Sequence, residues 1–576
     1  MKSGYWTREL IVGLFHLITP YWNSEEKKSA RLYLAGIITL TIAAVYMTLL
    51  LNEWFNSFYS ALQNYDSDAV YRGLLRFTGL AFAHIAFAVY SYYLQQRLAL
   101  RWRKWMTKNY LAKWTGQQMY YRLEMFSQGT ADNPDQRISE DINLFTARTL
   151  SFMSGLLRSA TIIVCFIFVL WNLSEVLSFS AAGQEIHIYG YLVWTALAYS
   201  VLGTWITHKV GHRLVSLNYL QQKLEADFRF SMVRLRETAE SVAFYNGAAK
   251  EESFLSNRFM TLLRNTLFII KKQKQLSWLT NSYAQIAIIF PFVVAVPRYL
   301  SQNISLGGLM QIANCFGKVQ DAMSYFVDVY ASLAEWQSCA KRLLSFDRHI
   351  AAIEKETEEK SGSLVREETP DKLRLTDVTI SVPAMDENKR TREIISSASC
   401  TIKSEEHVIL KGPSGSGKST LLRTLAGFWP YVKGHISMPA PSEMMFIPQK
   451  PYIPMGTSAE AASYPLETAD KEILSPLLVE CGLSHLMEKT DTEADWSHIL
   501  SLGEQQKLAF VRVFLRKPKW VFLDEATSAM DEETEEKMYR LLTALPGTTV
   551  ISIGHRSTLD KWHDRVLRIE NGKLIG

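Results

Sequence analysis

Long stretches without charged residues alternate with charged segments in the first half of the chain. Five stretches contain no Asp, Glu, Lys or Arg, and they lie between positions 31 and 53, 76 and 97, 158 and 175, 185 and 209, and 274 and 298. Because about 20 apolar residues in a helix cross a hydrocarbon core of about 30 Å, each stretch predicts a transmembrane helix, the third with help from flanking residues. A buried core helix explains one such stretch but not five.

A sixth span is needed if the chain is to end on the side of the membrane where it begins. The weaker apolar run "ISLGGLMQIANCFG", residues 304–317, supplies it. Its Gln311 and Asn314 favour a helix that lines a wet cavity rather than one that faces lipid. Three acids then follow Asn314 at seven-residue intervals: Asp321, Asp328 and Glu335. On one continuous helix they share a face, which predicts either a negative cavity wall that favours cationic cargo or a solvated surface.

Basic residues are distributed unevenly among the segments that join these spans. The segments after the second and fourth spans are rich in them: Arg101, Arg103, Lys104, Lys108, Lys113, Arg229, Arg234, Arg236, Lys250 and Arg258. Residues 176–187 contain none. The positive-inside rule therefore predicts that both long segments and both termini are cytoplasmic. Residues 1–29 predict an amphipathic helix in the membrane interface, or alternatively a soluble N-terminal helix.

The composition changes at residues 351–372, which are crowded with charge and predict a domain linker. Residues 30–350 are thus expected to form the membrane domain. From 373 onward, "LRLTDVTISV" alternates apolar and polar positions as a half-buried strand does. Strand-like and helix-like segments interleave to residue 576, which predicts an α/β domain.

A glycine-rich stretch in this domain, "GPSGSGKST", follows the apolar strand "HVIL" and precedes a helical pattern. This context is that of a phosphate-binding P-loop, in which backbone N–H groups surround the phosphates. The expected nucleotide contacts are Gly412, Pro413, Ser414, Gly415, Ser416, Gly417, Lys418, Ser419 and Thr420. Lys418 is expected to bind the β and γ oxygens and Ser419 to hold Mg²⁺.

Two carboxylates end the apolar strand "WVFLDE" about 100 residues beyond the P-loop. Asp524 is expected to hold Mg²⁺, and Glu525 is expected to act as the general base toward water. A third stretch, "ILSLGEQQKLAFVR", places Ser501 and Glu504 at the spacing of a capping box that starts a helix. The Ser501 hydroxyl and the backbone at Gly503 are the groups that meet a phosphate there, while Leu502 points elsewhere. The alternative is a plain capped surface helix.

Together these motifs resemble the nucleotide-binding domain of ATP-binding cassette (ABC) transporters over residues 373–576. The resemblance implies that Gln449 in "FIPQKPY" is the Q-loop glutamine, with catalytic and metal contacts, and that His555 in "ISIGHR" is the switch histidine. It further implies that Asp531 in "SAMD" is the D-loop acid and that Ser501, Gly503 and Glu504 belong to the signature. The family's aromatic residue against adenine has no counterpart in "TISVPAMDE".

The membrane half narrows the resemblance. "NEWFNSFYSALQ" and "NPDQRISEDI" are similar to motifs of SbmA/BacA-like uptake proteins and of their relatives fused to an ATPase. "ESVAFYNG" and "FWPYVKGHI" also resemble the peroxisomal fatty-acyl transporters. The resemblance implies an exporter-type fold that nonetheless imports, with substrates such as antimicrobial peptides or cobalamin, and it implies motion carried by the loops at residues 133–141 and 240–247.

The resulting prediction is a half-transporter with six transmembrane helices and one P-loop ATPase domain of ABC type, driven by ATP and Mg²⁺. A second copy of the chain, membrane lipid and a hydrophilic solute are the expected partners, in a bacterial inner membrane; nucleic acid is not expected. Alternatives are an acyl-CoA or lipid exporter, a slow-ATPase channel or regulator, and a soluble ABC ATPase, which the apolar spans disfavour. The net charge of +5 fits cytoplasmic loops rich in Lys and Arg, and the five scattered cysteines predict neither a disulfide framework nor a metal site.

Overall fold

The computed structural model describes residues 8–126, 133–174, 177–181, 184–361, 364–383 and 391–576. The chain divides into two compact units, a helical unit and an α/β unit. The helical unit comprises residues 1–120 and 127–349, and the α/β unit comprises residues 121–126 and 350–576.

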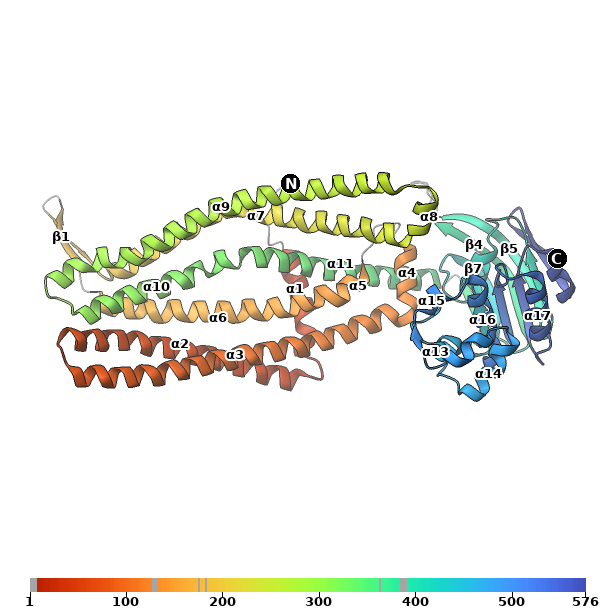
Figure 1. The fold of residues 1–576 in the computed structure, drawn as a ribbon, viewed down its shortest axis with the longest axis horizontal. Helices are drawn as coiled ribbons and strands as arrows, with labels where there is room; N and C mark the ends of the chain where they lie inside the picture. The colour runs from red at the N-terminus through yellow and green to blue at the C-terminus, as the bar shows by residue number, and fades with distance from the viewer. Residues whose placement is uncertain (1–7, 127–132, 175–176, 182–183, 362–363, 384–390) are drawn as a thin grey trace. The chain divides into compact units, whose positions relative to one another are not determined.

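Long helices make up the helical unit (Figure 1). The helices from the start of the chain to the linker are α1 (Arg8–Trp22), α2 (Lys27–Gln63), α3 (Ser67–Thr115), α4 (Met119–Phe126), α5 (Pro134–Gln136), α6 (Ile142–Leu173), α7 (Tyr191–Glu237), α8 (Ala239–Phe244), α9 (Ala248–Leu300), α10 (Leu306–Asp328) and α11 (Tyr330–Ser361). A π-helical turn, Arg137–Asp141, leads into α6, and a hairpin of β1 (Leu177–Ala181) and β2 (Gln184–Ile188) separates α6 from α7.

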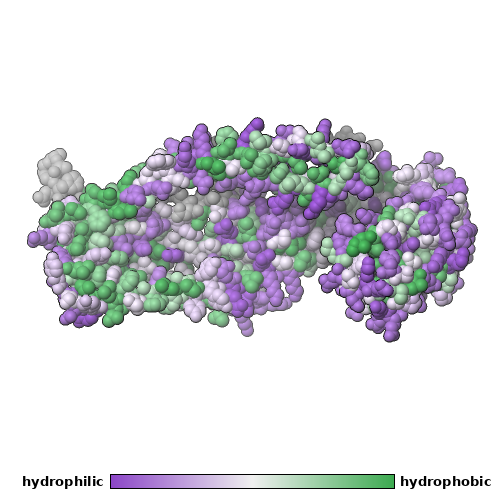
Figure 2. Space-filling view, viewed as in Figure 1, coloured by the Kyte–Doolittle hydropathy of each residue, from purple (hydrophilic) through white to green (hydrophobic). Residues whose placement is uncertain are grey.

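Among the described residues, four helical segments are long and apolar enough to cross a membrane: Lys27–Gln63, Ser67–Met125, Pro134–Leu173 and Ala248–Leu300. They contain the first, second, third and fifth expected spans. The fourth and sixth lie on α7 and α10, which do not meet that criterion. Polar Gln311 and Asn314 lower the hydropathy of α10, as expected for a helix that packs inside a bundle. Figure 2 shows hydrophobic side chains gathered over the halves of the helices toward the α2–α3 turn.

Helix packing in this unit joins segments that are far apart in the sequence. Helix α10 packs on α2 and α6, and α7 runs along α9. The core where α6, α7, α9 and α10 meet contains Phe166, Leu170, Cys315, Phe316 and Val319, all buried. The described helix α1 packs its Tyr21 ring on Trp102 at a centroid distance of 5.5 Å, so one of its faces lies on protein rather than on lipid.

The α/β unit contains two main sheets and a helical subdomain. Its strands are β3 (Leu364–Glu368), β4 (Lys372–Pro383), β5 (Thr391–Lys403), β6 (Val408–Lys411), β7 (Val432–Met438), β8 (Met444–Ile447), β9 (Gly456–Thr457), β10 (Glu493–Ala494), β11 (Trp520–Asp524), β12 (Thr549–Ile553), β13 (Arg565–Glu570) and β14 (Lys573–Ile575). Its helices after α11 are α12 (Lys418–Leu425), α13 (Ser458–Ser463), α14 (Lys471–Glu480), α15 (Trp496–Ile499), α16 (Leu502–Arg516) and α17 (Glu532–Thr543).

The larger sheet has the order β14-β13-β6-β12-β11-β8, with β8, β11, β12, β6 and β13 parallel. The second sheet has the order β3-β7-β4-β5. Two cores cover the larger sheet, one shared with the second sheet and one with α14 and α16. The stretch expected as a linker, residues 351–372, contains the end of α11 and β3, whose residues pair with β7. Because β3 is mostly exposed and charged, its composition resembles that of a linker.

Residues 121–126 of α4 belong to the α/β unit although they lie between two membrane helices in the sequence. The Tyr121 ring meets the Phe428 ring edge to face at 4.9 Å, and Met125 packs against the core beneath the second sheet. The loop expected to carry motion, residues 133–141, packs differently within the helical unit: Asp141, which is buried, pairs with Arg137 at 2.9 Å and with Arg342.

Candidate nucleotide-binding site

The expected nucleotide contacts gather at the carboxyl ends of four parallel strands. The P-loop follows β6, Gln449 follows β8, Asp524 and Glu525 end β11, and His555 follows β12. Since parallel strands present their carboxyl ends at one edge of a sheet, side chains that are up to 143 positions apart meet there. This edge is the usual place for a ligand in an open α/β sheet.

The P-loop surrounds a site for negative charge. Lys418, which is buried, donates from Nζ to the carbonyls of Gly412 at 2.8 Å and Pro413 at 2.9 Å. Gly415 and Gly417 have φ of 79° and 100°, which turns the chain so that successive N–H groups can face one point before α12 begins. Burial lowers the pKa of Lys418, and the carboxylates of Glu525 and Asp524 oppose that shift. Ser416 Oγ is buried and has no hydrogen-bond partner among the residues that the structure describes, which fits a loop built around a ligand.

Oxygen donors converge beside Lys418. Ser419 Oγ donates to Asp524 Oδ1 at 3.1 Å, and burial raises the pKa of Asp524. The Ser419 hydroxyl and the Asp524 carboxylate are hard-oxygen ligands of the kind that Mg²⁺ prefers, and the resemblance adds the amide oxygen of Gln449. The residues therefore fit the metal. Mg²⁺ at this point would neutralise phosphate charge as a Lewis acid.

Glu525 contacts the two polar side chains that the resemblance placed near it. Gln449 Nε2 donates to Glu525 Oε2 at 3.0 Å, and His555 Nε2 lies 3.2 Å from Glu525 Oε1. The backbone of Glu525 has a φ of 48°, a conformation that costs a non-glycine residue about 1–2 kcal/mol. Its N–H donates to the Ile553 carbonyl at 3.0 Å, which holds it there. Strain of this kind collects at functional positions.

The opening of α16 has the expected capping box. Ser501 Oγ accepts from the Glu504 N–H at 3.3 Å, and Glu504 Oε2 accepts from the Ser501 N–H at 2.9 Å. Leu502 is the first helical residue, has no positive φ and is 41% exposed, so its side chain points to solvent. Gly503 has a steric requirement: an added Cβ would lie 2.8 Å from the Ala529 carbonyl oxygen. Leucine is therefore acceptable at 502, whereas 503 needs glycine.

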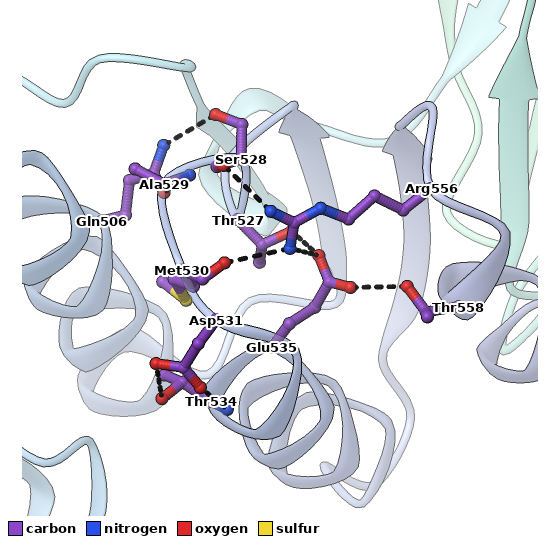
Figure 3. Close-up of polar contacts among 10 residues, drawn as sticks. All are labelled: Gln506, Thr527, Ser528, Ala529, Met530, Asp531, Thr534, Glu535, Arg556 and Thr558. Atoms are coloured by element: carbon purple, nitrogen blue, oxygen red, sulfur yellow. Dashed lines mark hydrogen bonds and ion pairs between the residues drawn. The ribbon is translucent and has the colours of Figure 1, made fainter.

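Three residues that the sequence analysis did not single out hold the loop that precedes α17 (Figure 3). Gln506 donates to Ser528 Oγ at 3.2 Å and accepts from the Ala529 N–H at 3.0 Å, which joins this loop to α16. Arg556 donates to the carbonyls of Met530 at 3.0 Å and Ser528 at 3.2 Å. In the sequence, the only sign that Arg556 belongs to the site is its position directly after His555.

The buried carboxylate of Glu535 completes this network. Arg556 Nη1 lies 3.3 Å from Glu535 Oε2, and the hydroxyls of Thr527 and Thr558 each donate to the carboxylate at 2.8 Å. Asp531 caps α17 by accepting from the Thr534 N–H at 2.8 Å. Hydrogen bonds and the ion pair thus fix the loop between the Glu525 strand and α17 from two sides.

The expected contacts fall into two groups. Lys418, Ser419, Asp524, Gln449, Glu525 and His555 lie together at the sheet edge. Among the described residues, no hydrogen bond or ion pair joins Ser501, Gly503, Glu504 or Asp531 to the P-loop. Of the adenine-side stretch "TISVPAMDE", the structure describes only residues 379–383, at the end of β4.

Comparisons with known proteins agree with this architecture. A family model described as ABC transporter transmembrane region 2 matches residues 16–300, and one described as ABC transporter matches residues 395–528. The chain is 33% identical over 553 residues to the inner membrane ABC transporter ATP-binding protein YddA of Escherichia coli, covering 95% of this chain and 96% of that protein. The chain belongs to the ABC transporter family. This ABC transporter is a half-transporter, with one transmembrane region fused to one ATPase domain, and it couples ATP hydrolysis to transport.

Two further matches extend the comparison. The transporter is 28% identical to the human lysosomal cobalamin transporter ABCD4, over 97% of this chain and 94% of that protein. Its fold matches the structure of a bacterial Atm1-family ABC exporter with ATP bound, with a TM-score of 0.72, 17% identity and 95% of both chains covered. The expected exporter-type fold, a helical membrane domain with an ABC-type α/β ATPase, is therefore confirmed.

Proposed function

We propose that this half-transporter works as a homodimer that imports a hydrophilic solute at the expense of Mg²⁺-dependent ATP hydrolysis. The contact of Glu525 with both Gln449 and His555, beside Lys418 and the Ser419–Asp524 pair, carries the proposal. In this assignment Glu525 accepts a proton from the attacking water, and His555 orients the γ-phosphate. Lys418 and the N–H groups of residues 412 and 414–420 bind the phosphates, and Ser419, Asp524 and Gln449 are the Mg²⁺ ligands.

The chain has one P-loop and one signature, on separate parts of the ATPase domain. We therefore assign Ser501, Gly503 and Glu504 to the ATP held by the P-loop of a second copy, with Asp531 at the same interface. A two-fold symmetric pair satisfies both sites with identical contacts. The exposed N-terminus of α16, where free N–H groups attract an anion, supports this assignment.

The proposed domains are an interfacial segment at 1–29, a membrane domain at 30–350, a linker at 351–372 and an ATPase domain at 373–576. Within them, α4 is the proposed mechanical link, because its residues 121–126 lie against the ATPase domain at Phe428. Phe428 follows α12, whose first residue is Lys418. Closure around ATP would thus move α4 with the P-loop helix.

The proposed cargo is a hydrophilic compound such as a peptide or cobalamin. The resemblance of two sequence motifs to those of SbmA/BacA-like uptake proteins and the similarity to a cobalamin transporter support this class. The similarity to an inner membrane protein supports a bacterial inner membrane location. A test compares uptake of labelled peptide and of labelled cobalamin by cells with wild-type protein, with Glu525→Gln and without the protein. ATP-dependent uptake of either compound supports the proposal. Outward movement of acyl-CoA, or uptake that Glu525→Gln leaves unchanged, would favour the exporter or the channel instead.

A further inference from the structure

A partly open cavity with charged and polar groups on its wall lies among α2, α3, α6 and α10 of the helical unit. Its volume is about 550 Å³, within the range of about 300–1,000 Å³ that small-molecule sites occupy. The polar side chains of its wall include Thr48, His84, Arg158, Asn314, Lys318 and Asp321. Apolar residues such as Phe55 and Ile162 complete the wall.

This cavity lies well inside the span of the helices. The ends of α2, α6, α9 and α10 meet at one end of the unit: Gln63 Oε1 accepts from the Leu306 N–H at 2.8 Å, and Arg298 donates to the Leu173 carbonyl at 3.2 Å. From that end, Thr48, Arg158 and Asp321 are each about 15 residues along their helices, or about 22 Å at the rise of an α-helix. In a hydrocarbon core of about 30 Å, all three belong to the membrane interior.

Charges at this depth almost always pair with one another or serve a pathway. Several other polar groups of the helical unit are paired. Asn52 exchanges hydrogen bonds with Gln311 and Asn314 at 3.2 Å, and Arg148 lies 3.7 Å from Glu335. The side chains of Arg158, Lys318 and Asp321 differ, because none of them forms an ion pair or a hydrogen bond with another residue in the described part of the chain. Arg158 and Asp321 are exposed and Lys318 is half-buried, so all three can meet whatever fills the cavity.

The charges on the cavity wall also define the chemistry of that occupant. Arg158 and Lys318 supply two cations, and Asp321 supplies one anion. Of the stripe expected from Asn314 to Glu335, Asn314 and Asp321 line this cavity, Glu335 lies 3.7 Å from Arg148, and the side chain of Asp328 lies outside the described residues. A purely cationic solute would meet two like charges here, and a purely anionic one would meet Asp321.

We propose that this cavity is a solute-binding site for a small zwitterion, such as a short peptide with free termini. Arg158 and Lys318 bind its carboxylate, and Asp321 binds its ammonium group. The assignment rests on the proposed transport function and gives it a substrate class. A lipid headgroup with a phosphate and an ammonium group offers the same chemistry. We assign the site to a soluble solute, because Thr48, Ser159 and Asn314 add hydrogen-bonding groups around the charges.

Three peptides of similar size differ in charge: trialanine is a zwitterion, trialanine amide is a cation and N-acetyl-trialanine is an anion. Differences in their affinities therefore report on charge. Equilibrium binding of each is measured without ATP, on full-length protein in phosphate-free glycolipid bilayers and again in bilayers with phosphatidylethanolamine. Trialanine should bind about tenfold more tightly than the other two, as expected for one charge-assisted contact of about 1.5 kcal/mol. Arg158→Gln and Lys318→Gln should each weaken trialanine binding about tenfold while leaving binding of the amide within about twofold.

Two control variants test whether a loss of binding comes from unfolding of the protein. Arg158→Lys keeps the charge and should retain most of the binding, and Lys274→Gln removes an exposed charge from α9 outside the cavity and should change nothing. Equal affinity for the three peptides, or no binding, overturns the proposal. Competition by phosphatidylethanolamine that abolishes peptide binding assigns the cavity to lipid and overturns it too. ATP hydrolysis by the same wild-type preparation tests the proposed function separately, and its absence overturns that function. ATP-driven uptake without binding of the zwitterion overturns only the assignment of the cavity as a zwitterion site.

Discussion

Gln449 Nε2 donates a hydrogen bond to Glu525 Oε2 at 3.0 Å while His555 Nε2 lies 3.2 Å from the other oxygen of the same carboxylate. Both oxygens of the proposed general base are therefore occupied by protein groups. Each carboxylate oxygen has a second lone pair, so Glu525 can still accept a hydrogen bond from a water molecule while both contacts persist. Gln449 and His555 therefore orient the base rather than block it.

The signature helix offers a test of two neighbouring residues. Leu502→Gly should change ATPase activity less than about twofold, because the leucine side chain faces solvent and its backbone is already helical. Gly503→Ala should reduce activity strongly, because its Cβ would lie 2.8 Å from the Ala529 oxygen. ATPase rates of the two purified variants check this. A large gain from Leu502→Gly would mean that leucine impairs the site.

The pair of Arg556 and Glu535 should position the loop between Glu525 and α17. Arg556→Gln leaves a buried carboxylate without its cation and two carbonyls without a donor, so we expect a loss of about 1.5–3 kcal/mol in unfolding free energy or an equivalent loss in ATPase rate. Arg556→Lys should recover only part of this loss, since lysine lacks the planar guanidinium group that donates several hydrogen bonds at once. Arg568→Gln, an exposed arginine on β13, is the control. If Arg556→Gln and Arg568→Gln have the same stability and the same ATPase rate, Arg556 does not position the loop.

Acid should destabilise the ATPase domain through His563. Burial lowers the pKa of His563, which has both ring nitrogens within 2.8 Å of protein oxygens, at Leu559 and Ser552. Below the ordinary histidine pKa of 6.5 the unfolded chain binds a proton that the folded chain resists. The free energy of unfolding therefore falls as the pH falls, by at most about 1.4 kcal/mol per pH unit. Melting temperatures at pH 7.5 and 5.5 should differ more for wild type than for His563→Gln. An equal drop in both would contradict this cause.

The orientation in the membrane can be tested by cysteine labelling in a cysteine-free background. Tyr65, in the turn between α2 and α3, is almost fully exposed, and Lys250 lies in the first turn of α9, directly after α8. A membrane-impermeant thiol reagent added outside intact cells should label a cysteine at 65 but not at 250, since the basic segments lie inside. Labelling of position 250 alone would reverse the topology.

Local chemistry explains which features the sequence predicts well. The P-loop, the capping box at Ser501 and the carboxylates at the end of β11 each depend on a few consecutive residues, so their patterns identify them. The contact of Arg556 with Glu535 depends on how two loops meet, and the cavity charges Arg158, Lys318 and Asp321 come from two helices whose register only packing sets. The stripe from Asn314 to Glu335 assumed one continuous helix. The structure separates α10 from α11 only at Val329, whose N–H still donates to the Tyr325 carbonyl at 3.0 Å and whose carbonyl accepts from the Leu333 N–H at 2.7 Å.

The most direct test of the central claim is the ATP turnover of Glu525→Gln in purified full-length protein, measured beside ATP binding and beside Glu532→Gln. Glu532 is an exposed acid at the start of α17, so its variant makes the same chemical change outside the site. Loss of the general base should cost at least about a hundredfold in turnover with ATP binding retained, whereas Glu532→Gln should behave as wild type. Turnover by Glu525→Gln within a few-fold of wild type would contradict the assigned role of Glu525 and, with it, this account of the site.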